Sequence, residues 1–288
     1  MIKQYFSIKD RNEKDYDYLF IRITEKKSKD DNLICELQKK ILQGYRDPDY
    51  LQRKRRNLDR NGLIEYIQKK VIPNKVNNFD MAVRYGDFGE MFASLVIEYM
   101  YSKKTFHKLR WKYNPDKSVF GTDIVAFDSL ENPSEITYYE VKTRENALEK
   151  DVVKKGNKRL KIKAIKEFVT IIAYKSLEKD ALSDKESIMD YMSRLFWAEQ
   201  KYDESDLFSD LVDGKKTVSR CYGIFVITDS NIAYEKCKEM LIELKKIKKN
   251  IGPLTVTFVF IDEIKELMTE TWNTIAQHGA EFVERNLL

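Results

Sequence analysis

The sequence has few of the residues that build the commonest catalytic and metal centres. Its 288 residues include only two histidines, His107 and His278, which leave little material for a histidine metal site or a Ser-His-Asp triad. Its three cysteines, Cys35, Cys221 and Cys237, lie far apart and form no Cys-x-x-Cys pair. This spacing argues against a zinc cluster or a disulfide framework and favours free thiols in a reducing compartment.

Long apolar runs and phosphate-binding loops are also missing. No segment approaches the ~18–20 continuous apolar residues of a membrane span, and residues 1–6 lack the apolar core of a signal peptide. We therefore expect a cytoplasmic protein with no membrane partner. No Gly-x-x-x-x-Gly-Lys motif occurs, so the chain carries no visible ATPase site of its own.

The composition is that of a folded chain with a strongly polar surface. Hydrophobic residues make up 42% and aromatic residues 12%, which is enough for a core, while charged residues reach 34%. The length allows one large domain or two modest ones. The net charge of +5 permits nucleic-acid binding without requiring it, so the distribution of charge matters more than the total.

Two stretches rich in β-branched and aromatic residues, 120–127 and 136–143, predict an antiparallel strand pair joined by a polar loop. Strand alternation places Glu140 and Lys142 on one face, and Asp123 lies on the neighbouring strand. A divalent cation would neutralise Asp123 and Glu140 together, and Mg²⁺ favours such oxygen ligands. The alternative is a surface hairpin with a Glu/Lys pair at its rim.

A metal held by these acids would lower the pKa of a bound water and stabilise charge on a phosphoryl oxygen. Lys142 would then position that water and offset negative charge in the transition state. Upstream, residues 84–101 predict a largely buried helix with Glu90 in its first turn. Glu90 is either a partner of the helix dipole or a third acid aimed at the metal, and the strand pair favours the metal.

These residues resemble a known motif. A helical Glu90, then Asp123, then Glu140 and Lys142 on successive strands is similar to the PD-(D/E)xK phosphodiesterase superfamily, although Thr122 stands where the motif has proline. The resemblance implies an α/β nuclease core, a mixed central sheet flanked by helices, which uses Mg²⁺, with Mn²⁺ as a substitute, to hydrolyse DNA. It also implies that the Val141 carbonyl joins the metal ligands.

The run from 84 to 144 is further similar to HamA, the nuclease subunit of the Hachiman anti-phage defence system. That resemblance implies a superfamily 2 helicase partner, HamB, which restrains the nuclease until foreign or damaged DNA is engaged. The sequence shows no base-reading module, so cleavage with little sequence specificity is expected. Two alternatives stay open: a catalytically silent DNA-binding subunit of a helicase complex, and a structure-specific repair nuclease.

We expect an N-terminal α/β extension over residues 1–80, either a small lobe or an addition to the sheet, and a nuclease domain over 81–288. The nuclease domain would contain a helical acidic insertion at about 176–220, which either docks a basic partner, blocks a basic groove or is a solvated elaboration. Two basic runs are candidate DNA contacts, although the first could equally be a solvated helix face. Their residues are Arg53, Lys54, Arg55 and Arg56, and then Lys154, Lys155, Lys158, Arg159 and Lys161.

The remaining expected elements follow from apolar periodicity and capping residues. The expected strands are 16–24, 108–113, 222–229 and 254–261. The expected helices are 33–42 with Asp30 or Asp31 as N-cap and Gly44 as its end, then 63–71, 164–174 with a basic start, 231–248 and 264–287.

Overall fold

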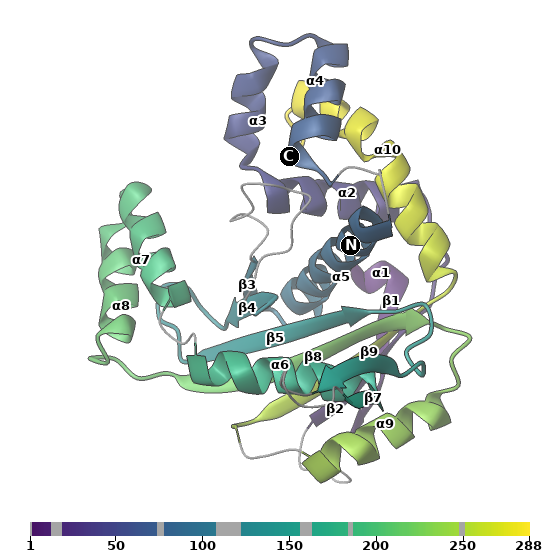
Figure 1. Cartoon of the computed structure of the whole chain (residues 1–288). Helices are drawn as coiled ribbons and strands as arrows, with labels where there is room; N and C mark the ends of the chain where they lie inside the picture. The colour runs from purple at the N-terminus through teal and green to yellow at the C-terminus, as the bar shows by residue number, and fades with distance from the viewer. Residues whose placement is uncertain are drawn as a thin grey trace.

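The computed structural model describes residues 2–12, 19–73, 78–107, 122–155, 163–183, 187–247 and 251–288. Within these ranges a seven-stranded mixed sheet is flanked by helices (Figure 1), as the sequence predicted. The strand order is β1-β2-β9-β8-β5-β4-β3. The strands are β1 (Phe6–Asn12), β2 (Leu19–Glu25), β3 (Lys104–His107), β4 (Ile124–Phe127), β5 (Glu135–Thr143), β8 (Ser219–Asp229) and β9 (Leu254–Ile261).

The centre of the sheet is parallel and its edges are antiparallel. Strands β2, β9, β8 and β5 run in the same direction, whereas β1 pairs with β2, and β3 and β4 extend from β5, in antiparallel fashion. Residues 222–228 of β8 are all buried, as expected for a central parallel strand covered on both faces. The predicted antiparallel pairing of β4 with β5 is confirmed, with Ile124 opposite Tyr139.

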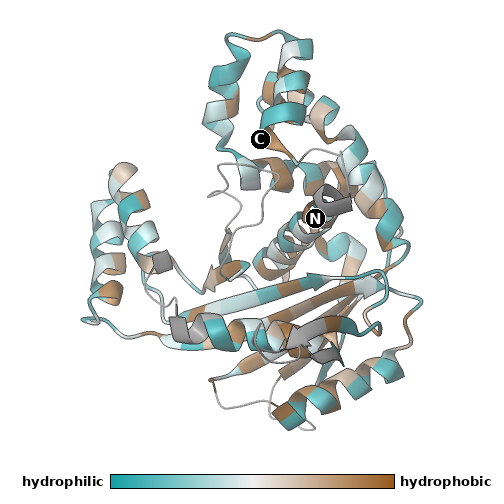
Figure 2. Ribbon diagram, in the orientation of Figure 1, coloured by the Kyte–Doolittle hydropathy of each residue, from teal (hydrophilic) through white to brown (hydrophobic). Residues whose placement is uncertain are grey.

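Helices cover both faces of this sheet (Figure 1). On one face a core cluster joins α1 (Ile2–Tyr5), α2 (Asp31–Tyr45), α5 (Asn78–Met100) and α10 (Ile264–Glu284) to the sheet. On the other face a second cluster joins α6 (Val169–Ser183) and α9 (Tyr234–Ile247) to the sheet. The same cluster extends to α7 (Ser187–Ala198) and α8 (Tyr202–Val212), which stand beside the β4–β3 edge of the sheet (Figure 1). Figure 2 shows hydrophobic residues concentrated in the central strands between these layers.

The N-terminal region contributes both strands and helices. Because β1 and β2 pair beside β9, this part of the chain extends the central sheet; whether residues 1–80 form a separate domain stays a prediction. Asp30 is the N-cap of α2 and accepts from the Leu33 amide at 3.1 Å. Gly44 does not end α2, because the helix runs to Tyr45 and Arg46 caps it. Two short helices follow, α3 (Pro48–Arg55) and α4 (Arg60–Tyr66), and α4 continues into a π-helical turn, Ile67–Val71, before Pro73.

The sequence prediction was wrong at the start of the helix expected over 164–174, and it did not anticipate the strand pair that precedes α6. The basic start of the expected helix instead forms a strand pair, β6 (Asp151–Lys155) with β7 (Lys163–Glu167), and α6 begins only at Val169. Cross-strand pairing overrides helix propensity here, with Val152 opposite Lys166. The acidic insertion is helical, as predicted. The expected strand 108–113 lies outside the described residues.

The two C-terminal strands and their helices match the prediction closely, and α10 is unbroken from Ile264 to Glu284. Across the described ranges, no helix combines the length and the apolar character needed to cross a membrane.

Candidate active site

A cavity of about 320 Å³ lies where the carboxyl end of β5 meets the first half of α5. Four of the five residues predicted to catalyse or bind metal line it: Glu90, Asp123, Val141 and Lys142. The remaining lining residues are Ala82, Tyr85, Gly86, Thr143, Arg144 and Glu145. The fifth predicted residue, Glu140, does not line the cavity but is the chain neighbour of Val141, which does.

Asp123 is placed by the register of the strand pair. Ile124 of β4 is opposite Tyr139 of β5, so one further step along the antiparallel pair brings Asp123 opposite Glu140. The Asp123 carboxylate accepts a hydrogen bond from the Val141 amide at 2.8 Å. Asp123 is buried, and this bond orients its carboxylate from the backbone of β5.

Glu140 and Lys142 form an ion pair along β5, with 2.7 Å between Lys142 Nζ and Glu140 Oε1. Only 6% of the Glu140 side chain is exposed, against 22% for Lys142. The alternative interpretation, an exposed Glu/Lys pair at the rim of a surface hairpin, is therefore wrong. One acid and its counter-ion are instead enclosed beside the cavity, where water screens their interaction weakly.

Glu90 occupies the middle of α5 and not its first turn, because the helix begins at Asn78. A role as partner of the helix dipole is therefore wrong, since that effect fades within the first turn. The residue before it, Gly89, sets the contact with the sheet. A Cβ at Gly89 would overlap the Thr143 side chain and lie 3.5 Å from Val141 Cγ1. The close approach of α5 to β5 is what brings Glu90 to the cavity.

A cluster of buried polar side chains on α5, next to Glu90, was not identified from the sequence. Arg84, Asp87 and Glu90 are spaced by three residues on α5, so they share one side of the helix, and all three are buried. Arg84 donates to the Pro73 carbonyl at 2.6 and 3.0 Å. The i, i+3, i+6 spacing of charged residues within an apolar helix was the signal that could have identified this group.

Tyr45 of α2 completes that group by donating its hydroxyl to Asp87. Burial, followed by the charge of Asp87, raises the pKa of Tyr45 well above its ordinary value. The phenol is therefore neutral and acts as a donor at physiological pH. It ties α2 to the side of α5 from which Glu90 projects.

The donor chemistry of the cavity suits a hard divalent cation. Glu90 and Asp123 bring carboxylate oxygens to its lining, and Val141, whose carbonyl the superfamily resemblance implies as a further ligand, lines it as well. Mg²⁺ in phosphoryl-transfer sites takes one or two carboxylates and completes its shell with water and phosphate. Among the residues that the structure describes, no three His, Cys, Asp or Glu side chains are grouped closely enough to hold a metal ion by themselves. The residues fit a two-carboxylate site, with Glu140 held beside it by Lys142.

The two basic runs lie in different parts of the molecule. Arg53, Lys54 and Arg55 are on α3, with Arg56 at its C-cap, and α3 lies far from β7 in Figure 1. The second run is next to the cavity, because Arg144 lines the cavity and pairs with Asp151 of β6 at 2.9 Å. Lys154 and Lys155 follow on β6, whereas Lys158, Arg159 and Lys161 lie outside the described residues.

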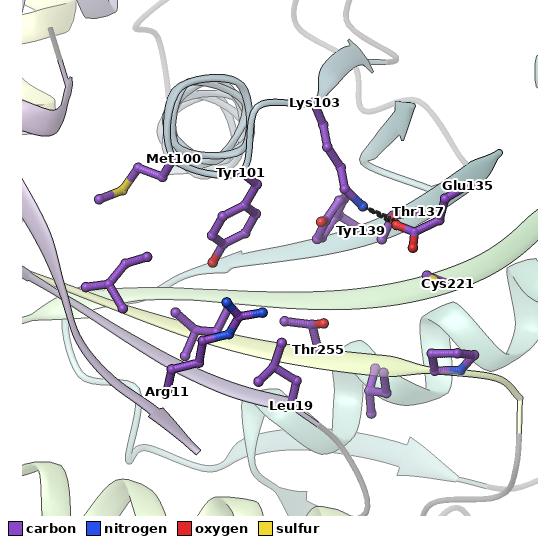
Figure 3. Close-up of a pocket in the computed structure, with 14 residues that line it drawn as sticks. Arg11, Leu19, Met100, Tyr101, Lys103, Glu135, Thr137, Tyr139, Cys221 and Thr255 are labelled. Atoms are coloured by element: carbon purple, nitrogen blue, oxygen red, sulfur yellow. Dashed lines mark hydrogen bonds and ion pairs between the residues drawn. The ribbon is translucent and has the colours of Figure 1, made fainter. Parts of the chain in front are cut away.

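A larger cavity, about 720 Å³, lies at the opposite end of β5, below the last turn of α5 (Figure 3). Its labelled lining includes Arg11, Tyr101, Lys103, Tyr139 and Thr255, and it contains none of the predicted site residues. Size alone would therefore point to the wrong end of the strand. The carboxylates mark the smaller cavity as the candidate active site.

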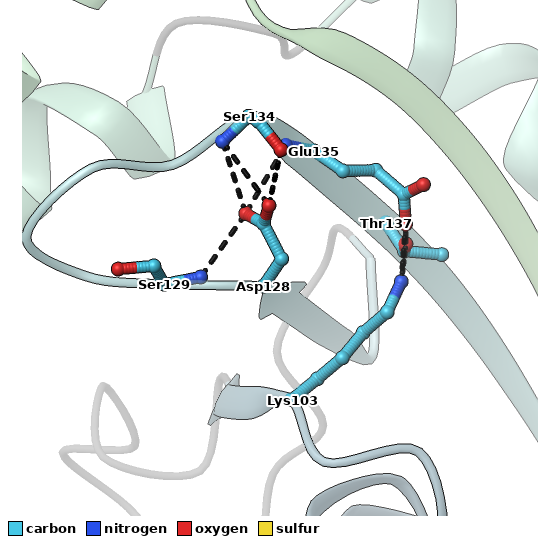
Figure 4. A network of polar contacts seen from close by, with 6 residues as sticks. All are labelled: Lys103, Asp128, Ser129, Ser134, Glu135 and Thr137. Atoms are coloured by element: carbon cyan, nitrogen blue, oxygen red, sulfur yellow. Dashed lines mark hydrogen bonds and ion pairs between the residues drawn. The ribbon is translucent and has the colours of Figure 1, made fainter.

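A polar network borders this second cavity and closes the turn before β5 (Figure 4). Lys103 pairs with Glu135 and donates to Thr137 Oγ1 at 2.7 Å. In the adjoining loop, Asp128 accepts from the amides of Ser129, Ser134 and Glu135 at 3.0–3.1 Å. Burial raises the pKa of Asp128, but the hydrogen bond from the Ser134 hydroxyl, together with those from the three amides, outweighs burial and lowers it. The network fixes where β5 starts, and so the register that places Asp123 opposite Glu140.

The fold and the cavity define a mixed α/β protein with buried carboxylates and a lysine at the carboxyl end of a central strand. The HamA family model matches residues 2–275, and the chain belongs to the HamA family, which connects it to Hachiman defence against phages. The match spans both β1 and β2 and every predicted site residue. No curated protein matches the chain. The broader resemblance to the PD-(D/E)xK superfamily stays a prediction.

Proposed function

We propose that this protein is a Mg²⁺-dependent deoxyribonuclease, the effector of a Hachiman defence complex, which cuts DNA with little sequence specificity and is restrained by a partner helicase. The observation that carries the proposal is the cavity that gathers Glu90, Asp123 and Lys142 around Val141. Membership of the HamA family supports the defence role.

The chemistry assigns a separate task to each group. A bound divalent ion would supply Lewis acidity to water and to the scissile phosphate. Glu90 and Asp123 would hold that ion, and the Val141 amide keeps the Asp123 carboxylate oriented. Lys142 would orient the attacking water and offset charge on the phosphoryl oxygens, with Glu140 holding its ammonium in position before DNA arrives.

The surroundings of the cavity suit a polymer with a charged backbone. Arg144 is 44% exposed at the cavity and adjoins the basic β6–β7 pair, which would follow the phosphates. Phosphate contacts of this kind carry no sequence information. We therefore expect a DNase without a recognition site, and such an enzyme needs a partner that limits its action in the cell.

Plasmid cleavage tests the proposal. Wild-type protein with Mg²⁺ should nick supercoiled plasmid, the double variant Glu140→Ala/Lys142→Ala should not, and the helicase encoded beside it should suppress cleavage until ATP and damaged DNA are added. The matched control is Glu243→Ala/Lys246→Ala, which removes another short-range Glu–Lys pair, on α9, whose side chains are 44% and 62% exposed. Equal loss of activity in both double variants would contradict a specific role for the pair on β5.

Metal binding gives a readout that does not depend on activity. Titration with Mn²⁺ followed by electron paramagnetic resonance should show one or two bound ions, and Asp123→Asn should weaken their binding at least tenfold. The variant keeps the shape of the side chain and an acceptor for the Val141 amide, so loss of binding would reflect the lost charge.

A second function is favoured by one observation. Because Glu140, predicted as a metal ligand, does not line the cavity and is paired with Lys142, the alternative is a catalytically silent DNA-binding subunit of the helicase complex. The two functions differ in the Mn²⁺ titration: a silent subunit binds DNA but shows no ion whose binding depends on Asp123.

A further inference from the structure

Helices α7 and α8 form a hairpin that stands away from the sheet beside β3 and β4 (Figure 1). Two serines connect the helices, since each hydroxyl donates to the other residue's carbonyl: Ser193 to Ser205 and Ser205 to Ser193, both at 2.9 Å. Phe208 of α8 packs edge-on against Phe127 of β4 with 5.3 Å between ring centroids. The hairpin is therefore a packed, anchored element and not a loose excursion of the chain.

The tip of this hairpin carries an aromatic pair that contributes little to the core. Trp197 is 61% and Tyr202 50% exposed, and their rings meet at 69° with 4.9 Å between centroids. The turn between them is defined by Gln200, whose φ is 62°, and by a bond from the Lys201 amide to the Phe196 carbonyl at 2.9 Å. Rigidly presented Trp and Tyr side chains are the residue types that dominate protein–protein binding energy.

The hairpin has the opposite charge from the rest of the protein. Residues 187–213 contain seven acidic and two basic residues, a net charge of −5, whereas the whole chain is +5 and the remainder is therefore +10. Both basic residues are already paired inside the hairpin, Arg194 with Asp190 at 2.8 Å and Lys201 with Glu199 at 2.7 Å. Asp210 and Asp213, at the other end of α8, pair with Lys215 at 3.4 and 2.8 Å. The acidic charge next to the aromatic pair is therefore that of Asp203 and Glu204, in the first turn of α8.

We propose that the tip of the α7–α8 hairpin is a docking surface for a partner protein that presents an apolar pocket with a basic rim. Trp197 and Tyr202 fill the pocket, and Asp203 and Glu204, in the first turn of α8, face the basic rim. DNA is a poor occupant, because its phosphates would meet this acidic surface. A second copy is also disfavoured, since a hairpin bound to the basic surface of the next copy makes an open-ended contact that covers the residues needed for DNA.

This inference rests on the proposed function in one respect: the partner used to test it is the helicase encoded beside the chain. Binding of the full-length proteins is measured by biolayer interferometry at two salt concentrations. Trp197→Ala/Tyr202→Ala should weaken binding about 30-fold, the size of a hot-spot truncation. Asp203→Lys/Glu204→Lys should also weaken binding of the helicase, and by a larger factor at low salt than at high salt.

The control variants alter similar residues elsewhere on the surface. Ile242→Ala removes an apolar side chain that is 50% exposed on α9, and Glu239→Lys reverses an exposed charge on the same helix. Both should bind the helicase as the wild type does. Circular dichroism of every variant, together with plasmid cleavage by the free chain, verifies that the fold is intact.

The outcomes separate the docking surface from the function itself. Helicase binding that is unchanged in both hairpin variants overturns the docking surface and leaves the partner in place. If the wild type does not bind the helicase, both the docking surface and the helicase partner are overturned. Cleavage of plasmid by the free chain would still support the proposed nuclease activity. Weaker DNA binding in the aromatic variant, by fluorescence anisotropy, or a change in self-association, by light scattering, would assign the tip to nucleic acid or to a second copy and overturn the proposal.

Discussion

The close packing of α5 against β5 can be tested by adding a single methyl group at Gly89. In an open helix, replacing glycine by alanine stabilises the fold by about 1 kcal/mol, because alanine loses less backbone entropy. At Gly89 the new methyl would overlap the Thr143 hydroxyl and approach Thr143 Cβ to 3.1 Å. Rotation of the hydroxyl does not clear the Cβ, so the helix or the strand must shift. Overpacking of this kind costs about 1–3 kcal/mol.

The same helix supplies the matched control. At Gly86, three residues earlier, an added Cβ would meet no other atom within 4 Å, so Gly86→Ala should stabilise the protein by the full helix-propensity gain. Gly86→Ala and Gly89→Ala share this helix-propensity gain, so it cancels when their free energies of unfolding are compared. We expect Gly89→Ala to be less stable than Gly86→Ala by about 1–3 kcal/mol, the overpacking cost alone. Urea unfolding followed by circular dichroism measures both values.

The variant Gly89→Ala/Thr143→Ala extends the test. Removing the hydroxyl and the γ-methyl of Thr143 leaves only the Cβ contact, so the cost of the added methyl should fall below half. Glu90 follows Gly89 directly, so Gly89→Ala should also slow DNA cleavage more than Gly86→Ala does. Equal stabilisation by the two alanines, or strictly additive effects of the Gly89 and Thr143 changes, would refute the close seating of α5 at this point.

Three further predictions concern single side chains. Because its hydrogen bonds lower the pKa of Asp128, the carboxylate stabilises the fold fully above the pKa of an unfolded aspartate, and this contribution is lost as pH falls through the folded value. Asp128→Asn should therefore cost at most about 1 kcal/mol at pH 7, because solvent screens this exposed carboxylate, and progressively less as pH falls below the pKa of an unfolded aspartate, by urea titration at each pH. Tyr45→Phe removes the donor to buried Asp87 and should cost about 1–2 kcal/mol, whereas Tyr202→Phe, at an exposed site, should leave the melting temperature unchanged. Burial raises the pKa of Cys237 to about 12, so iodoacetamide at pH 8 should alkylate it only after unfolding, and labelling of the native protein seen by mass spectrometry would contradict that burial.

Strand alternation made the centre of the site predictable. The β4–β5 pair, the shared face of Glu140 and Lys142, and the buried strands β8 and β9 all follow from patterns only a few residues long. The same local reasoning failed for residues 163–167, where lysines and apolar residues support either a helix or a strand. Pairing with β6 decided the outcome, and that pairing depends on a partner a dozen residues away.

The sequence by itself determined which residues could carry the chemistry: two acids and a lysine on neighbouring strands, and a third acid on a buried helix. Only the tertiary structure decided that Glu90 reaches the cavity, because its position there depends on the contact of Gly89 with Thr143, more than fifty residues later. The same holds for Tyr45 and Asp87, which are 42 residues apart and meet only when α2 packs on α5. The physical reason is that alternation and helical period act over a few residues, whereas the approach of distant elements is set by packing of the whole core.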